Sequence, residues 1–204
     1  MENNSDKLYR AVLKQNFNPL KIYSKYSTPR MPANIPYVVD NLWEYLRPEE
    51  MPSRRFAVYA SPTPELALKN ASNKEIDRNS YVVCRVDIKD KNCKVAQLSL
   101  EDARLHSDVK LLTRLMVESL GEVFSSDNHA LRTVLAPVFA PVLPRTEMQR
   151  LADSYTILKD TLNKVTNEST FWSSASNTIQ TDGLGEVFFE LAGGSSSNYQ
   201  LSPI

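Results

Sequence analysis

The sequence contains few of the residues on which metal and redox sites depend. Only two cysteines and two histidines occur among the 204 residues. Cys84 and Cys93 do not form a Cys-x-x-C pair and have no histidine partner nearby. We therefore expect a buried strand cysteine and a spare thiol in a reducing compartment rather than a disulfide. His106 and His129 lack the paired spacing of zinc ligands, so we expect no metal site.

Glycine-rich nucleotide motifs and long apolar runs are also absent. The sequence has neither G-x-G-x-x-G nor a Walker-type loop, which disfavours dinucleotide oxidoreductases and phosphoryl-transfer enzymes. The longest apolar tract, residues 130–143, contains Arg132 and two prolines and is shorter than the roughly 20 residues of a spanning helix. The first residues do not resemble a Sec signal peptide. We expect a cytoplasmic protein, in the producing cell or in a target cell, with no membrane partner.

Charge balances over the whole chain but not along it. Residues 1–60 carry nine basic and six acidic groups, whereas residues 121–204 carry five basic and nine acidic groups. A polyphosphate cofactor or a nucleic-acid acceptor would prefer the first region. Overall neutrality argues against an extended non-specific DNA-binding surface, and a solvated charge asymmetry is the simpler interpretation. With 42% hydrophobic residues the chain can bury the core of one domain.

Residues 54–88 predict a strand, a capped helix and a second strand. Residues 56–60 are apolar and rich in strand formers. Thr63 and Pro64 then provide an N-cap and a first helical residue. Residues 81–88 open with an apolar run and continue in alternation, which predicts a half-buried strand.

The remaining segments predict a mostly helical middle of the chain. We expect a first strand at residues 7–13 and a short return strand at residues 93–98 that could form a hairpin with the strand before it. Helices are predicted at residues 35–46 with Asn34 as N-cap, at residues 108–120 between Ser107 and Gly121, and from Thr146 to Val165. The last has a seam at heptad spacing over only about two and a half heptads, which is short for an autonomous coiled coil, so we favour a helix on the core over a docking helix for a partner. Residues 198–204 are expected to be a short tail.

Three segments resemble the ADP-ribosyltransferase superfamily. Residues 59–61 (Tyr-Ala-Ser), a helix with small residues and the strand at residues 81–86 are similar to the middle of the poly-ADP-ribose polymerase branch. Residues 8–11 (Leu-Tyr-Arg-Ala) resemble its first core strand and the start of the toxin domains named for an Arg-Glu-Ser triad. Residues 185–190 resemble the late strand that opens with the catalytic glutamate. These segments follow the family's order and span most of the chain.

The resemblance implies an NAD site without a metal, in which NAD is the substrate. Arg10 stands where the polymerase branch has histidine and would hold NAD, while Tyr59 would stack on the nicotinamide. Ser61 and Arg54 would lie near the cofactor, although Ser61 could simply end the strand and Arg54 could be solvent-exposed. Glu186 would be the catalytic carboxylate, because an anion beside the ribose stabilises its oxocarbenium character as nicotinamide leaves.

The family's Glu-x-Glu pair is absent, and the second late glutamate, Glu190, is four residues after Glu186. Either glutamate is therefore a candidate for the catalytic carboxylate. Phe171 and Trp172 lie in a hydroxyl-rich segment before Glu186, where the family handles the acceptor. They could stack on a base or contact a protein, with packing in the core as the commoner alternative.

The resemblance implies an α+β fold with the split mixed β-sheet of ADP-ribosyltransferases and flanking helices. We expect one domain over residues 1–204 with a mainly helical insertion at about residues 101–168. The expected function is that of an NAD-dependent toxin or effector that transfers ADP-ribose to a macromolecule, with RNA or DNA slightly favoured over protein. An antitoxin or immunity protein would be a typical partner. The alternatives are an NAD-degrading glycohydrolase on the same fold and a catalytically inactive binding module.

Overall fold

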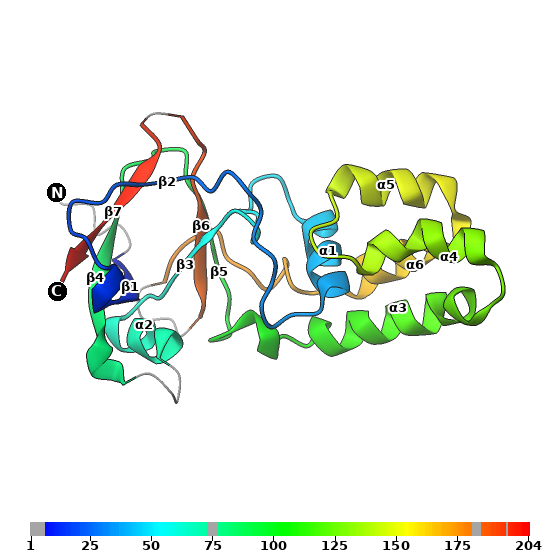
Figure 1. Ribbon diagram of the computed structural model, residues 1–204, viewed down its shortest axis with the longest axis horizontal. Helices are drawn as coiled ribbons and strands as arrows, with labels where there is room; N and C mark the ends of the chain where they lie inside the picture. The colour runs from blue at the N-terminus through cyan, green and yellow to red at the C-terminus, as the bar shows by residue number, and fades with distance from the viewer. Residues whose placement is uncertain (1–6, 73–76, 181–184, 195) are drawn as a thin grey trace. The chain divides into compact units, whose positions relative to one another are not determined.

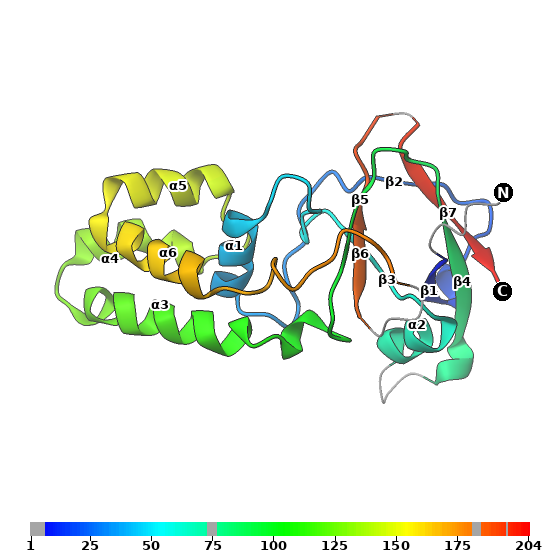
Figure 2. The same ribbon diagram turned by 180° about the vertical axis from the view of Figure 1, so that it is seen from behind.

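The computed structural model describes residues 7–72, 77–180, 185–194 and 196–204, which form two compact units (Figure 1). The sheet unit comprises the described parts of Met1–Thr28, Glu49–Ala103 and Ala175–Ile204. The helical unit comprises Pro29–Pro48 and Arg104–Ser174. The sheet unit holds the strands and one helix, α2, and the helical unit holds α1 and α3 to α6 (Figure 2). The protein is therefore of mixed α+β class.

The described strands form two antiparallel sheets. The first has the order β1 (Leu8–Leu13), β4 (Tyr81–Ile88), β7 (Asn198–Pro203) and β2 (Tyr23–Ser24). The second has the order β3 (Val58–Ala60), β6 (Val187–Glu190) and β5 (Lys94–Gln97). Two backbone hydrogen bonds of 2.8 Å between Tyr9 and Ser61 connect β1 to the end of β3.

Strand alternation decides which side chains enter the core of the sheet unit. Successive side chains point to opposite faces of a strand. The apolar cluster takes one face of each sheet, with Leu8, Cys84, Val86 and Leu201 from the first and Val58, Ala60, Val187 and Phe189 from the second. Arg10 pairs directly with Cys84 and therefore lies on the core-facing side of β1. Tyr59 and its cross-strand partner Phe188 project from the other face of the second sheet.

The helix α2 (Pro64–Ala71) begins as the sequence predicts. Thr63 Oγ1 accepts a hydrogen bond from the Leu66 N–H at 3.2 Å, and Pro64 is the first helical residue. The helix buries Leu66 and Ala67 and packs against β1 and β4. Its last residue, Ala71, is thereby held beside the core-facing side of β1.

The helical unit consists of α1 (Tyr37–Leu46), α3 (Asp108–Ser125), α4 (His129–Leu135), α5 (Arg145–Ser154) and α6 (Thr156–Glu168). The predicted apolar stripes of α1 and α3 are buried, including Trp43 and Met116, each 0% exposed. α3 packs against α6 and α1. Within the described residues no helix combines the length and the apolar character that crossing a membrane requires.

Asp108, at the start of α3, is the polar centre of this unit's core and is 0% exposed. Its carboxylate accepts hydrogen bonds from Trp43 Nε1 (3.1 Å), Ser169 Oγ (2.6 Å), Thr170 N (3.2 Å) and Phe171 N (3.2 Å). Burial alone would raise the pKa of Asp108, but these hydrogen bonds and His106 hold that pKa well below its ordinary value. The carboxylate ties the start of α3 to the turn that follows α6.

Two predicted helix boundaries are wrong. α1 begins at Tyr37 with Pro36 as its N-cap residue, not at Ile35 after Asn34. A proline disfavours helical conformation at the residue before it, which here is Ile35. α3 continues through Gly121 to Ser125. Gly121 has no positive φ, and no atom lies within 4 Å of where its Cβ would be, so it occupies an ordinary helical position.

The helix predicted from Thr146 to Val165 is two helices. Tyr155, with φ −132° and ψ 106°, separates α5 from α6, so the heptad seam is not continuous. Leu151, Leu158 and Val165 are nevertheless buried in the helical unit. This corresponds to the core interpretation of the segment rather than to a docking helix.

Two predictions about the strands are also wrong. β5 pairs with β6 in the second sheet, not with β4, so the expected hairpin does not form. Residues 198–203 are not a tail but form β7, an internal strand between β4 and β2. The C-terminal strand thereby holds the first sheet together.

Candidate functional site

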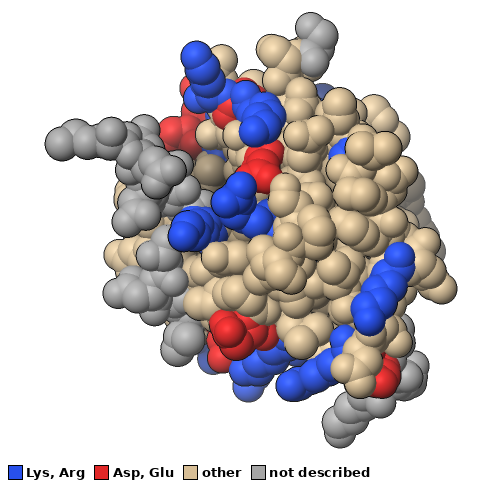
Figure 3. All heavy atoms as spheres, turned by 90° about the vertical axis from the view of Figure 1, so that its left-hand side faces the viewer, with Lys and Arg blue, Asp and Glu red and all other residues tan. Residues whose placement is uncertain are grey.

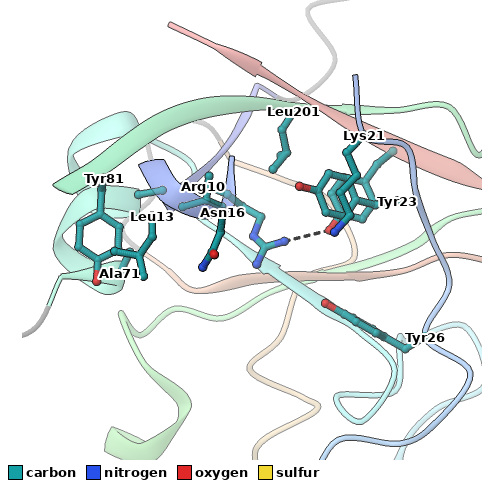
Figure 4. Close-up of a pocket in the computed structure, with 12 residues that line it drawn as sticks. Arg10, Leu13, Asn16, Lys21, Tyr23, Tyr26, Ala71, Tyr81 and Leu201 are labelled. Atoms are coloured by element: carbon teal, nitrogen blue, oxygen red, sulfur yellow. Dashed lines mark hydrogen bonds between the residues drawn. The ribbon is translucent and has the colours of Figure 1, made fainter. Parts of the chain in front are cut away.

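A cavity of 410 Å³ lies beside the core-facing side of β1 (Figure 4). Figure 4 shows Tyr81, Leu13 and Ala71 at one end, Arg10 and Asn16 in the middle, and Lys21, Tyr23 and Tyr26 at the other end. Tyr199 and Leu201 contribute from β7. The cavity lies entirely within the sheet unit.

Arg10 is the central cation of the cavity. Its Nη1 donates a hydrogen bond of 2.9 Å to the hydroxyl oxygen of Tyr199. A guanidinium carries five N–H donors, so this bond uses only part of its capacity. A partly buried charge needs polar partners, and an anionic ligand in the cavity would supply them.

The aromatic wall of the cavity is built from stacked rings. Tyr23 lies on Tyr199 with ring centroids 4.8 Å apart and an interplanar angle of 14°. The Lys21 ammonium lies 4.9 Å from the centroid of the Tyr23 ring. Burial raises the pKa of Tyr199 to about 12 against the opposing effect of Arg10, so its hydroxyl is protonated at neutral pH.

The charge of the lining has one sign. Arg10 and Lys21 are basic, and no aspartate or glutamate occurs among the described residues that line the cavity. Neither cation has a carboxylate within ion-pair distance in the described part of the chain. Residues 7–39 contain six lysines and arginines and no acidic residue. The cavity is therefore suited to an anionic ligand with aromatic groups.

Glu186 lies outside this lining, in a partly buried cluster with Arg54 and Tyr59. Glu186 Oε2 accepts a hydrogen bond from the Ala103 N–H at 3.0 Å and lies 3.7 Å from Arg54 Nη1. Burial raises the pKa of Glu186, while Arg54 and the Ala103 N–H oppose the shift. The Arg54 guanidinium lies 5.3 Å from the Tyr59 ring centroid and 5.4 Å from that of Phe188.

The structure divides the residues predicted for the NAD site into two groups. Arg10 faces the core side of β1, and Tyr59 projects from the face of the second sheet that points away from that core. Arg54 and Glu186 belong with Tyr59. The two predicted walls of one NAD pocket are thus not brought together in this structure. Strand alternation separates them, because the Tyr59 side chain points to the opposite face of β3 from its neighbours Val58 and Ala60, which enter the core.

Ser61 and Glu190 both make structural contacts. Ser61 is 3% exposed, and its hydroxyl oxygen lies 3.3 Å from the donating Asn70 Nδ2. Glu190 pairs with Lys25 at 2.9 Å and accepts a hydrogen bond from the Ser53 N–H at 2.7 Å. Neither residue lines the cavity.

Phe171 and Trp172 belong to the core of the helical unit. Phe171 is 0% exposed and stacks on Trp43 with centroids 3.9 Å apart. Trp172 is 9% exposed and donates a hydrogen bond of 2.7 Å from Nε1 to the Trp43 carbonyl. This is the core alternative weighed from the sequence, and Phe171 presents no open face on which a base could stack.

A serine, a histidine and an aspartate also meet in the helical unit, but not as a nucleophilic triad. His106 Nδ1 accepts a hydrogen bond from the Asp108 N–H at 3.1 Å. Nε2 faces Ser174 Oγ at 3.2 Å, and Ser174 in turn donates to the Phe171 carbonyl at 2.9 Å. The serine hydrogen is therefore directed to a backbone carbonyl and not to the histidine.

The sequence predicted Arg10 as a site residue but none of the other polar or aromatic residues of the lining, which are Asn16, Lys21, Tyr23, Tyr26, Tyr81 and Tyr199. Tyr199 could have been found, because residues 198–202 alternate polar and apolar side chains in the pattern of a half-buried strand. Lys21 and Tyr23 carry no such signal. They reach the cavity because β2 pairs with β7, a contact between residues far apart in the sequence.

Figure 3 shows one face of the sheet unit, where Lys and Arg side chains form separate groups with uncharged surface between them. This face has no continuous basic surface in its described part. The described residues also contain no group of three or more His, Cys, Asp or Glu side chains that could hold a metal ion.

Comparisons with protein-family models, with curated proteins and with solved structures found no match.

Proposed function

We propose that the protein is an NAD-dependent ADP-ribosyltransferase that binds NAD in the cavity around Arg10. The main support is the composition of the cavity lining. It combines Arg10, Lys21 and four tyrosines, and its described residues include no carboxylate. NAD has an anionic pyrophosphate between two aromatic ring systems, and this lining is complementary to both features. Arg10 is also the residue that the resemblance assigns to NAD. The division of the strands into two sheets is compatible with the split sheet that the resemblance implies, whereas the described strand pairs are all antiparallel and not mixed as predicted.

Cleavage of NAD needs an anion beside the ribose that carries the nicotinamide. Glu186 is the proposed carboxylate, but in this structure it pairs with Arg54 outside the cavity lining. Catalysis by Glu186 therefore requires that this pair opens and that the carboxylate moves to the cavity. That requirement favours a second candidate function, a module that binds NAD without cleaving it.

The acceptor is proposed to be a nucleic acid, with a toxin or effector role and an inhibitory partner protein. The support is the run of six basic and no acidic residues at positions 7–39. Phe171 and Trp172 lend no support, because they are core residues. A protein without an acceptor would release free ADP-ribose as an NAD glycohydrolase.

Binding is tested by titrating the protein with NAD in a calorimeter. We expect Arg10→Ala to weaken NAD binding by about tenfold or more, since it removes hydrogen bonds from a charged donor. Arg85→Ala is the matched control, because Arg85 is exposed on the other side of β4 and pairs with Asp87. Equal losses in both variants, or none in Arg10→Ala, would place the NAD site elsewhere.

Cleavage is tested with NAD labelled in its adenylate half. Nicotinamide release with label in nuclease-sensitive material supports transfer to nucleic acid, and label lost only with protease indicates a protein acceptor. Free ADP-ribose alone indicates the glycohydrolase, and binding without nicotinamide release indicates the inactive module. Glu186→Gln should slow release by about 10²–10³-fold if Glu186 is catalytic, with Glu190→Gln as the comparison.

A further inference from the structure

We infer that the Tyr199 hydroxyl and the Arg10 guanidinium act together as a two-donor clamp for a phosphate group of the ligand. Tyr199 belongs to β7, the strand in which the sequence predicted no chemistry. The identification of the ligand as NAD rests on the proposed function, whereas the clamp itself requires only a phosphate or pyrophosphate ester.

The Tyr199 ring is held in place on several sides. It is 2% exposed and stacks on Tyr23. It also meets Phe189 edge-on, with centroids 5.3 Å apart and an interplanar angle of 90°. Backbone pairing with Ile88 in β4 and Tyr23 in β2 fixes the strand on both sides. The hydroxyl is therefore a rigid point on the wall of the cavity.

The Tyr199 hydroxyl hydrogen is available for a hydrogen bond to the ligand. The hydroxyl oxygen accepts from Arg10 Nη1, so its own hydrogen points elsewhere. No acceptor for that hydrogen occurs among the residues that the structure describes. Because burial raises the pKa of Tyr199 to about 12, the hydroxyl keeps this hydrogen at neutral pH and remains a donor.

Arg10 supplies the complementary charge. Its other N–H groups lie at the cavity, where Figure 4 shows the guanidinium between Asn16 and Tyr23. A guanidinium and a neutral hydroxyl that are joined to each other can donate to two oxygens of one phosphate. Exposed Lys21 adds a second positive charge at the end of the cavity where Tyr23 lies.

The experiment measures binding of inorganic pyrophosphate, ADP-ribose and NAD by calorimetry. Tyr199→Phe keeps the ring and its stacking and removes only the hydroxyl. We expect all three ligands to bind about tenfold more weakly, as for loss of a hydrogen bond to a charged group. Tyr45→Phe is the matched control, because it removes a tyrosine hydroxyl that bonds Gln149 in the helical unit and lies outside the cavity lining. In an Arg10→Ala background, Tyr199→Phe should cause a smaller further loss than it does alone.

Unchanged pyrophosphate and ADP-ribose binding by folded Tyr199→Phe would overturn the clamp. If that variant does not fold, competition in the wild-type protein decides, because pyrophosphate that fails to displace ADP-ribose also overturns it. Tyr199-dependent pyrophosphate binding without NAD binding would keep the clamp and reject the proposed function. Equal NAD binding by the wild type and Tyr199→Phe would reject the clamp and keep the proposed function.

Discussion

At the scale of single residues, Asp108 shows how a buried charge can organise a core. Its carboxylate accepts hydrogen bonds from α1 and from the turn after α6. The sequence predicted the apolar stripes of these helices but not this junction. Carboxylate contacts between positions 43, 108 and 169 have no local signature, because they depend on how the helices pack.

Acid should destabilise the helical unit through Asp108. Its pKa is lowered in the folded state, so its stabilising contribution is present above the unfolded pKa of about 4 and is lost as pH falls through and below that value. We expect the free energy of unfolding to fall on going from pH 6 to pH 3, and to fall less steeply in Asp108→Asn. Urea denaturation followed by tryptophan fluorescence at each pH measures this. Parallel pH profiles in the two proteins would contradict the assignment.

At the scale of elements, local signals predicted the strands and helices best where capping and alternation agree. β1, β4 and α2 were confirmed for this reason. The strand partners were not predictable, because β5 and β7 pair with strands distant from them in the sequence. The candidate site follows the same division. Arg10 was predicted from the resemblance of residues 8–11 and lies at the cavity, but which face Tyr59 takes depends on the pairing of β3 with β6.

Gly185 is expected to be intolerant of a side chain. A Cβ there would lie 1.4 Å from the Leu98 carbonyl oxygen. The backbone would have to move, which would disturb the bonds from Leu98 N to Glu186 O and from Glu186 N to Leu100 O. We expect Gly185→Ala to reduce the free energy of unfolding by about 3 kcal/mol, the upper part of the usual range for overpacking.

Gly121→Ala is the matched control for that substitution. Gly121 lies within α3, where no atom would contact the new Cβ. Helix propensity favours alanine by about 1 kcal/mol, so this variant should be slightly more stable than the wild type. Thermal denaturation of both variants and the wild type compares their stabilities. Similar losses of stability in both variants would show that the close approach at Gly185 is not decisive.

At the scale of the whole molecule, each unit buries its own apolar residues, and the last strand belongs to the sheet unit. Deleting residues 198–204 removes Tyr199 and Leu201, each 2% exposed, from the core and the cavity. We expect the deletion to abolish nucleotide binding and the structure of the sheet unit while the helical circular-dichroism signal is largely kept. Deleting only Ile204, which is 68% exposed, is the control. Retained nucleotide binding in the longer deletion would show that β7 is dispensable.

The position of β7 has a consequence for the order of events during protein synthesis. β7 separates β4 from β2 in the first sheet and supplies Tyr199 to the cavity. The sheet therefore cannot close on the ribosome until residues 198–203 have left the exit tunnel. The helical unit ends at Ser174 and can assemble earlier. The ligand cavity is therefore incomplete until β7 has been synthesised and released, and any activity of this site begins only after that point.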